Sequence, residues 1–259
     1  MLVALSVVLL VLLVVPQGAA WAQQGEVLVF AAASLSDVLR PIVSDFEAGG
    51  GGRVVLNLAA SNVLARQIAA GARADLFVSA DEAQMERVAS DLVPGSRVAL
   101  LSNSLAVVVP DDRPRTLASV HELTDPSFAR IAVGDPAAVP AGAYARRYLE
   151  QEGLWDVLAP RLVPSGSVRL ALAAVETGAV DAAIVYRTDA AVARRARLAL
   201  SIPIGTGPRI VYPAALVRAG THRAAARALL AHLQGPQARR HFEAAGFIVA
   251  GPAAPAGGR

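Results

Sequence analysis

One local pattern occurs twice near the start of the chain: a short apolar run, two or more alanines, a serine and then a helix-like stretch. The first copy runs from Val27 to Ala32 and leads to Ser34, and the second runs from Arg53 to Leu58 and leads to Ser61. Consecutive strand–helix units of the same polarity form parallel strands whose carboxyl ends meet at one edge of a sheet. We therefore expect both serines at the edge where open α/β sheets bind ligands.

The alternation of strand-like and helix-like segments continues along the chain and predicts an α/β fold. We expect two lobes, each a mainly parallel sheet flanked by helices, with residues 26–104 and 210–250 in the first lobe and 105–209 in the second. Two chain crossings then join the lobes, as a hinged binding cleft requires. The further segments that support this interpretation are strands at 76–79, 105–109, 131–133, 182–186 and 209–217, and helices at 82–89, 141–152, 168–176 and 221–245.

The two ends of the chain are set apart by composition. Residues 1–22 carry no charge, contain a long apolar run and end in Ala20-Trp21-Ala22, a pattern typical of a secretory signal peptide. An uncleaved N-terminal anchor is the alternative. Residues 251–259 are rich in proline, glycine and alanine, and we expect them to be disordered. The chain has no cysteine, which excludes a thiolate metal site and a lipid-modified cysteine, so we expect an exported, periplasmic protein.

A serine at the start of a helix can hold an anion. The free N–H groups of the first helical turn point the same way as the hydroxyl, and the helix dipole adds about half a positive charge at that end. The alternative is that Ser34 only caps its own helix, with Asp37 completing a capping box. Two such turns on neighbouring parallel units favour the anion site, because their donors converge.

The second lobe offers donors of the same kind. Residues 134–142 follow a strand and lead into a helix, and residues 165–168 begin another; a loop shaped only by chain geometry and a plain helix cap are the alternatives. Tyr186 ends an apolar strand, where its hydroxyl would face the cleft, although a tyrosine there can also serve packing alone.

The charges near these turns discriminate between anions. The only charged residues within them are Asp37 and Asp135, which local caps can explain. Phosphate at neutral pH carries a proton and needs an acceptor, whereas molybdate, tungstate and sulfate need donors only. The turns therefore favour a fully deprotonated tetrahedral dianion.

Several stretches of the chain, in this order, resemble the periplasmic molybdate-binding proteins of molybdate ABC transporters, a family of type II periplasmic binding proteins. The resemblance covers about residues 26–249. It is carried by the stretches 29–35, 64–68, 74–81, 133–136, 139–142, 183–186 and 235–238.

The resemblance implies that a molybdate or tungstate ion is bound by Ser34, Ser61, the backbone N–H groups of Ala141 and Val168, and the hydroxyl of Tyr186. The metal would be held only through its oxyanion oxygens, with no other cofactor. It also implies ABC permease subunits as partners, and we expect a monomer. At Asn62 the chain departs from the family, in which another serine is frequent, and this leaves the effect on affinity open.

The motifs and charge of the chain also bear on other classes of function. A secreted hydrolase is disfavoured because the chain has no G-x-S-x-G, H-E-x-x-H or P-loop motif, and its four histidines lie away from the serine turns. No recognition-helix pattern accompanies the net charge of +3, so we expect no nucleic-acid partner. A binding protein for sulfate, thiosulfate or another small anion stays open, because sequence does not give the cavity radius.

Overall fold

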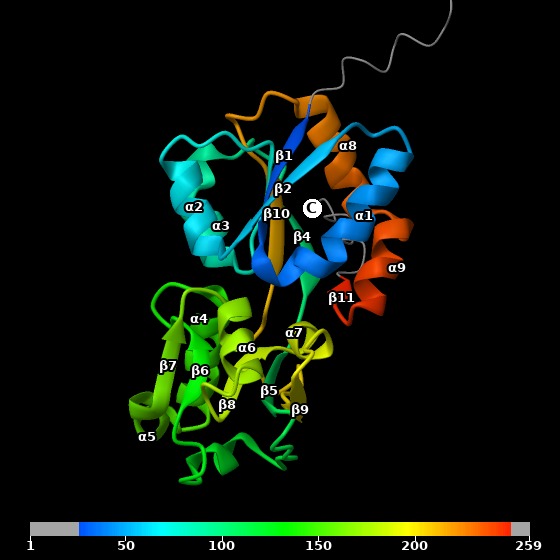
Figure 1. The fold of residues 1–259 in the computed structure, drawn as a ribbon. Helices are drawn as coiled ribbons and strands as arrows, with labels where there is room; N and C mark the ends of the chain where they lie inside the picture. Colours follow the sequence, from blue (N-terminus) through cyan, green and yellow to red (C-terminus); the bar gives the residue numbers. More distant parts are fainter. Residues whose placement is uncertain (1–25, 250–259) are drawn as a thin grey trace, which may run out of the picture.

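The computed structural model describes residues 26–249, which form two α/β lobes, one above the other in the view of Figure 1. The expected two-lobed α/β fold is confirmed. The signal peptide expected at 1–22 and the tail expected at 251–259 lie outside the described residues. Within the described part of the chain, no helix combines the length and the apolar character needed to cross a bilayer.

The first lobe contains a six-stranded sheet in the order β11-β4-β10-β3-β1-β2. Its strands are β1 (Val27–Ala32), β2 (Val54–Ala59), β3 (Leu76–Val78), β4 (Val98–Ser102), β10 (Tyr212–Leu216) and β11 (Ile248–Val249). Helices α2 and α3 cover one face, and α1, α8 and α9 cover the other (Figure 1). The helices of this lobe are η2 (Ala33–Leu35), α1 (Ser36–Ala48), α2 (Ser61–Ala69), α3 (Glu82–Arg87), η3 (Ala89–Asp91), α8 (Arg223–Gln234) and α9 (Pro236–Ala244).

The second lobe contains a five-stranded sheet in the order β7-β6-β8-β5-β9. Its strands are β5 (Leu105–Pro110), β6 (Ile131–Gly134), β7 (Leu162–Ser165), β8 (Ala182–Tyr186) and β9 (Ala196–Ser201). Its helices are η4 (Val120–Thr124), α4 (Pro140–Gln151), α5 (Trp155–Leu158), η5 (Ala159–Arg161), α6 (Val168–Glu176) and α7 (Arg187–Ala191).

Both sheets are mixed, whereas mainly parallel sheets were expected. β1 pairs in parallel with β2 and β3, and β6 with β7 and β8, but β10 runs antiparallel to β3 and β4. β5 likewise runs antiparallel to β8 and β9. The reason is connectivity: β5 and β10 follow the crossings, so each enters its sheet from the other lobe and opposes the strands of the βα units.

Four strands were not anticipated: β4, β7, β9 and β11. Three of them lie at sheet edges, where strands are short and less apolar. β7 contains Pro164 and β9 contains Arg197, and both residue types weaken a strand pattern in sequence. β11 has two residues only, too few for any period to be detected.

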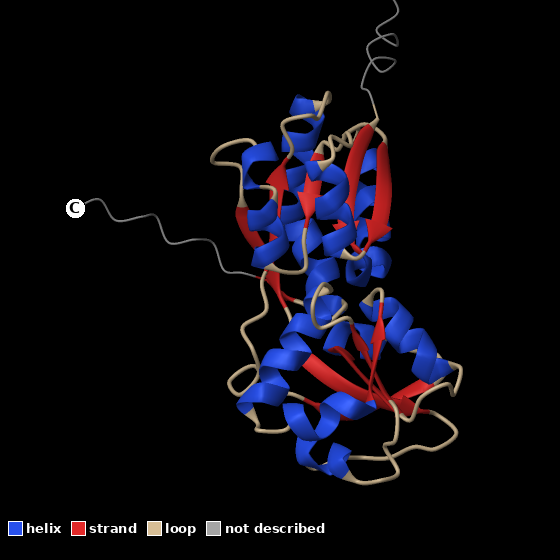
Figure 2. Ribbon diagram, turned by 90° about the vertical axis from the view of Figure 1, so that its left-hand side faces the viewer, coloured by secondary structure: helices blue, strands red, loops and turns tan. Residues whose placement is uncertain are grey.

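The chain passes between the lobes twice, once between Ser102 and Leu105 and once between Ser201 and Tyr212. The view turned by 90° in Figure 2 shows the two lobes with these segments running between them. Both crossings therefore lie beside the face that each lobe turns toward the other.

The register of β1 against β2 places the two serine turns. Ala32 pairs with Ala59 at the carboxyl end of this parallel pair, and Ser34 and Ser61 each follow two residues later. The prediction that both serines lie at one sheet edge is therefore confirmed.

Candidate functional site

A cavity of about 10 Å³ lies between the lobes, lined by η2 and α2 of the first lobe and by the N-termini of α4 and α6 of the second. In Figure 1 these elements lie where the two lobes face each other. The volume is far below the roughly 300–1,000 Å³ of sites for drug-sized ligands, so the cavity leaves room only for a small ion or molecule. All five residues named from the sequence line it. The full lining is Ala32, Ala33, Ser34, Ala60, Ser61, Ala80, Val139, Pro140, Ala141, Ser167, Val168 and Tyr186.

Ser34 lies in the short 3-10 helix η2, before α1 begins at Ser36. Its side chain caps neither helix, so the alternative of a capping box with Asp37 is wrong. Instead, the Ser34 Oγ lies 3.1 Å from the hydroxyl of Tyr212, which comes from β10 at a sequence separation of 178 residues. The serine is therefore held by a distant strand and is not needed to satisfy its own helix.

Ser61 is the first residue of α2, and its side chain does not cap that helix either. Its Oγ accepts a hydrogen bond of 2.9 Å from the backbone N–H of Ala80, which follows β3. A backbone N–H only donates, so the hydroxyl hydrogen of Ser61 stays available for an acceptor in the cavity.

Backbone donors come from the second lobe. Ala141 and Val168 lie in the first turns of α4 and α6, where N–H groups have no acceptor within the helix and the dipole favours a negative charge. Ser167 caps α6 by accepting a 3.2 Å hydrogen bond from Leu170 N–H, so the plain-cap interpretation is confirmed for its side chain.

Tyr186 is the last residue of β8, and its buried hydroxyl has no hydrogen-bond partner within residues 26–249. Burial raises its pKa well above the usual value, so the phenol keeps its proton. A buried hydroxyl of this kind needs an acceptor, and it lines the cavity where a bound anion would supply one.

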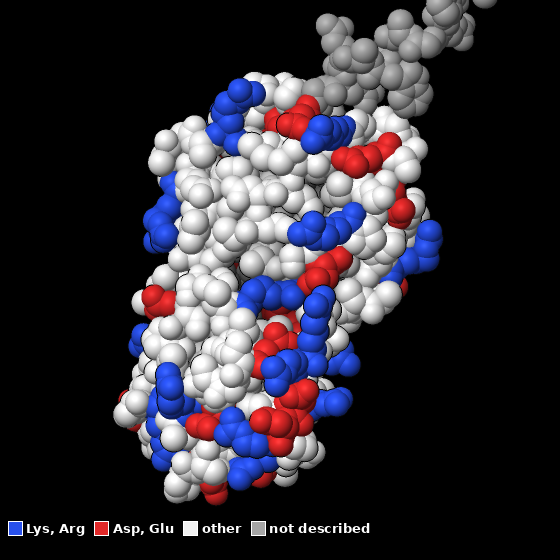
Figure 3. Space-filling model, viewed as in Figure 1, with Lys and Arg blue, Asp and Glu red and all other residues white. Residues whose placement is uncertain are grey.

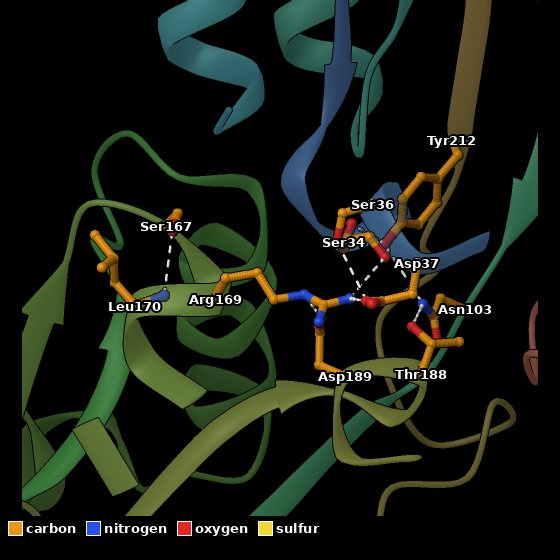
Figure 4. Close-up of polar contacts among 10 residues, drawn as sticks. All are labelled: Ser34, Ser36, Asp37, Asn103, Ser167, Arg169, Leu170, Thr188, Asp189 and Tyr212. Carbon is orange, nitrogen blue, oxygen red and sulfur yellow. Dashed lines mark hydrogen bonds and ion pairs between the residues drawn. The ribbon is translucent and has the colours of Figure 1, made fainter. Parts of the chain in front are cut away.

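Of the two carboxylates near the turns, one has the local partner that was expected and the other does not. Asp135 does serve a local turn, because it accepts a 2.9 Å bond from Ala137 N–H. Asp37 instead lies 2.7 Å from Arg169 of α6, which belongs to the other lobe (Figure 4). Arg169 also lies 2.7 Å from Asp189 and donates to the carbonyl oxygen of Ser34 at 3.3 Å.

The cavity itself is lined by uncharged residues, although acidic and basic side chains are interspersed over the outer surface in Figure 3. Within the described residues, no three His, Cys, Asp or Glu side chains gather as a metal site would require. Asn62 is buried on α2 and is not part of the lining. The arrangement can therefore hold an anion by neutral donors.

Sequence reasoning missed three residues around Ser34: Tyr212, Asn103 and Arg169. Tyr212 begins β10 directly after one crossing and Asn103 lies in the other crossing, so the only signal was a polar side chain in or beside each crossing. Arg169 directly follows Val168, and a single arginine at the start of a predicted helix does not indicate a partner in the other lobe.

Comparisons with known proteins show the family to which the chain belongs. The sequence profile for bacterial extracellular solute-binding protein matches residues 27–248. Molybdate-binding protein ModA of Escherichia coli (strain K12) is 39% identical, covering 90% of this chain and 92% of its own length. The structure of the Azotobacter vinelandii periplasmic molybdate-binding protein has a TM-score of 0.77 at 25% identity, covering 87% of this chain and 100% of that chain.

A further solved structure shares the fold. The sulfate-binding protein SubI from Mycobacterium tuberculosis H37Rv has a TM-score of 0.74 at 20% identity and covers 88% of this chain and 88% of that chain. Fold alone therefore does not distinguish one tetrahedral oxyanion from another, and the choice depends on the lining of the cavity.

Proposed function

Because the chain belongs to the bacterial extracellular solute-binding protein family, we propose that it is the solute-binding component of a molybdate ABC importer, with tungstate as a second ligand. It captures the oxyanion in the cavity between the lobes and delivers it to the membrane permease. It acts by binding, not by catalysis, and works as a monomer with no cofactor.

The observation that carries this proposal is the convergence of five neutral donors on one uncharged cavity. The hydroxyls of Ser34 and Ser61 come from the first lobe, and the N–H groups of Ala141 and Val168 and the hydroxyl of Tyr186 come from the second. Each charge-assisted hydrogen bond contributes about 1.5–3 kcal/mol net, so several of them outweigh the cost of binding.

The same lining argues for the kind of anion. A protonated oxyanion such as hydrogen phosphate needs at least one acceptor, and no carboxylate lines the cavity. A fully deprotonated molybdate, tungstate or sulfate needs donors only. Among these three anions we propose molybdate, because the two relatives described above with at least 25% identity are both molybdate-binding proteins.

Closure of the two lobes about the crossings completes the site, because each lobe supplies only part of the donors. Arg169 lies across the cleft from Asp37, which fits a closed form held together beside the ligand. The protein is exported by means of the segment 1–22 and acts in the periplasm. There its closed form docks on the permease.

The proposal is tested by titrating the purified protein with molybdate, tungstate, sulfate and hydrogen phosphate at fixed ionic strength. Melting temperature and calorimetry should both show tight binding of molybdate and tungstate and much weaker binding of hydrogen phosphate, since a ligand stabilises the state that binds it. A response to sulfate alone would assign the site to sulfate, and no response to any of the four would refute the proposal.

Substitution of Ser34 tests the site itself. Ser34→Ala removes one donor and should weaken molybdate binding by about 1.5–3 kcal/mol, or roughly ten- to a hundredfold in Kd. An unchanged affinity would contradict the assignment of Ser34.

A further inference from the structure

Three buried polar residues outside the cavity lining lie behind Ser34: Tyr212 of β10, Asn103 between β4 and β5, and Thr188 of α7 (Figure 4). Asn103 lies in one crossing, Tyr212 directly follows the other, and Thr188 belongs to the second lobe. Hydrogen bonds connect Thr188, Asn103 and Tyr212 in a chain that ends at the Ser34 hydroxyl, and we call this chain the relay.

The orientation of the Asn103 amide is set by the backbone. Its Oδ1 accepts a 2.9 Å hydrogen bond from the N–H of Ser104, so its Nδ2 faces the other way. There Nδ2 donates to Thr188 Oγ1 at 2.9 Å and, over a longer 3.4 Å, to the hydroxyl oxygen of Tyr212. An amide nitrogen only donates, so Tyr212 accepts in this contact.

Tyr212 then has its own hydrogen left to donate. Burial raises the pKa of Tyr212, so the phenol stays protonated, and the partner of its hydrogen is the Ser34 Oγ at 3.1 Å. If Tyr212 donates, Ser34 accepts, and the hydrogen of Ser34 is left for the cavity. The hydroxyl hydrogen of Ser61 is likewise left for the cavity, because its oxygen accepts a hydrogen bond from the N–H of Ala80.

We propose that Tyr212 and Asn103 are positioning residues that fix the Ser34 hydroxyl as a donor toward the cavity. The site thereby prefers an oxyanion without a proton over one that carries a proton. Without Tyr212, the Ser34 hydroxyl can rotate and also accept a hydrogen bond from a protonated ligand. This inference rests on the proposed oxyanion-binding function and adds the origin of its selectivity.

Tyr212→Phe is the variant that tests this. The ring keeps its contacts with Tyr186 and Phe247, at centroid distances of 5.7 and 5.6 Å, and only the hydroxyl is lost. Calorimetry should show the Kd for molybdate rising about five- to tenfold, as expected for one weakened hydrogen bond. The Kd for hydrogen phosphate should not rise, so the ratio of the hydrogen phosphate Kd to the molybdate Kd should decrease.

A double-mutant cycle separates positioning from packing. In a Ser34→Ala background, Tyr212→Phe should change the molybdate Kd less than about twofold, because the hydroxyl that Tyr212 positions is no longer there; this non-additivity shows that the two residues are coupled. Tyr148→Phe, on α4 and outside both the cavity and the relay, is the matched control and should leave both affinities unchanged. Asn103→Ala should shift the same ratio in the same direction, which keeps the test valid if Tyr212→Phe does not fold.

The outcomes are distinct. Equal effects of Tyr212→Phe on the molybdate Kd with and without the Ser34 hydroxyl would show a packing role and overturn the relay. If the wild type binds molybdate, the relay would also be overturned by a Tyr212→Phe protein with the same ratio of hydrogen phosphate Kd to molybdate Kd as the wild type. A wild type that binds no tetrahedral oxyanion would overturn the proposed function, and the relay with it.

Discussion

Arg169 of helix α6 lies 2.7 Å from Asp37 of helix α1, so an ion pair joins the two lobes beside the turn that carries Ser34. The same guanidinium lies 2.7 Å from the buried Asp189 and donates to the carbonyl oxygen of Ser34. Arg169 directly follows Val168, whose N–H is a proposed ligand donor. The arginine thus connects the turn of Val168 in one lobe to the turn of Ser34 in the other.

The first prediction concerns this ion pair. Arg169→Met keeps most of the side-chain length but removes the charge, so the closed form is less populated and the apparent affinity falls with that population. We expect the molybdate Kd to rise about tenfold, measured by calorimetry. Arg146→Met, which breaks an exposed pair with Glu150 within α4, is the control and should have no effect on Kd. Equal Kd values for the two variants would show that Arg169 does not support closure.

The second prediction concerns pH. Burial raises the pKa of Asp189 from 3.8 to about 7, and the nearby Arg169 limits the rise. Because the folded-state pKa exceeds the unfolded one, the contribution of Asp189 to stability is complete below about pH 4 and is lost as pH rises through about 7.

Asp189→Asn removes the titration and keeps the shape of the side chain. The free energy of unfolding of the wild type, measured in urea relative to this variant, should therefore decrease from pH 4 to pH 7. A difference that does not vary over this range would show that Asp189 is ionised throughout.

Sequence alone could locate Ser34, Ser61 and Tyr186 because each depends on a local pattern. The pattern is an apolar strand followed by a polar residue at its carboxyl end, next to small residues in the case of the serines, and it spans about ten residues. Parallel pairing of β1 and β2 then brings the two serines together with no further information.

The contacts that hold these residues depend on the crossings, which no local pattern records. Tyr212 reaches Ser34 across 178 residues, and Arg169 reaches Asp37 only because the lobes face each other. For the same reason the sequence does not reveal that β5 and β10 run antiparallel to their neighbours, and both sheets were expected to be mainly parallel. Local periodicity reports burial, but not the direction in which a strand enters its sheet.

The third prediction separates Ser61 from Ser34. Ser61→Ala removes a ligand donor and also leaves the buried N–H of Ala80 without its acceptor. Such a group costs about 1–3 kcal/mol, so both the free energy of unfolding and the affinity for molybdate should fall. Ser96→Ala is the matched control, because it likewise removes the acceptor of a backbone N–H, that of Leu216, but lies outside the cavity lining; it should reduce stability alone. A Ser61→Ala protein of unchanged stability would contradict the Ala80 contact.

The fourth prediction concerns Gly142, in the first turn of α4 beside Ala141. A Cβ at this position would lie 1.9 Å from the carbonyl oxygen of Gly134, so Gly142→Ala must push the start of α4 away from the end of β6. We expect a loss of about 1–3 kcal/mol in unfolding free energy, typical of overpacking, together with weaker molybdate binding because the N–H of Ala141 moves. Gly166→Ala, in the loop before α6, is the matched control, since its Cβ would meet only the Leu170 side chain, at 3.6 Å. If both variants bound molybdate equally well, the close approach of α4 to β6 would not be what places the Ala141 donor.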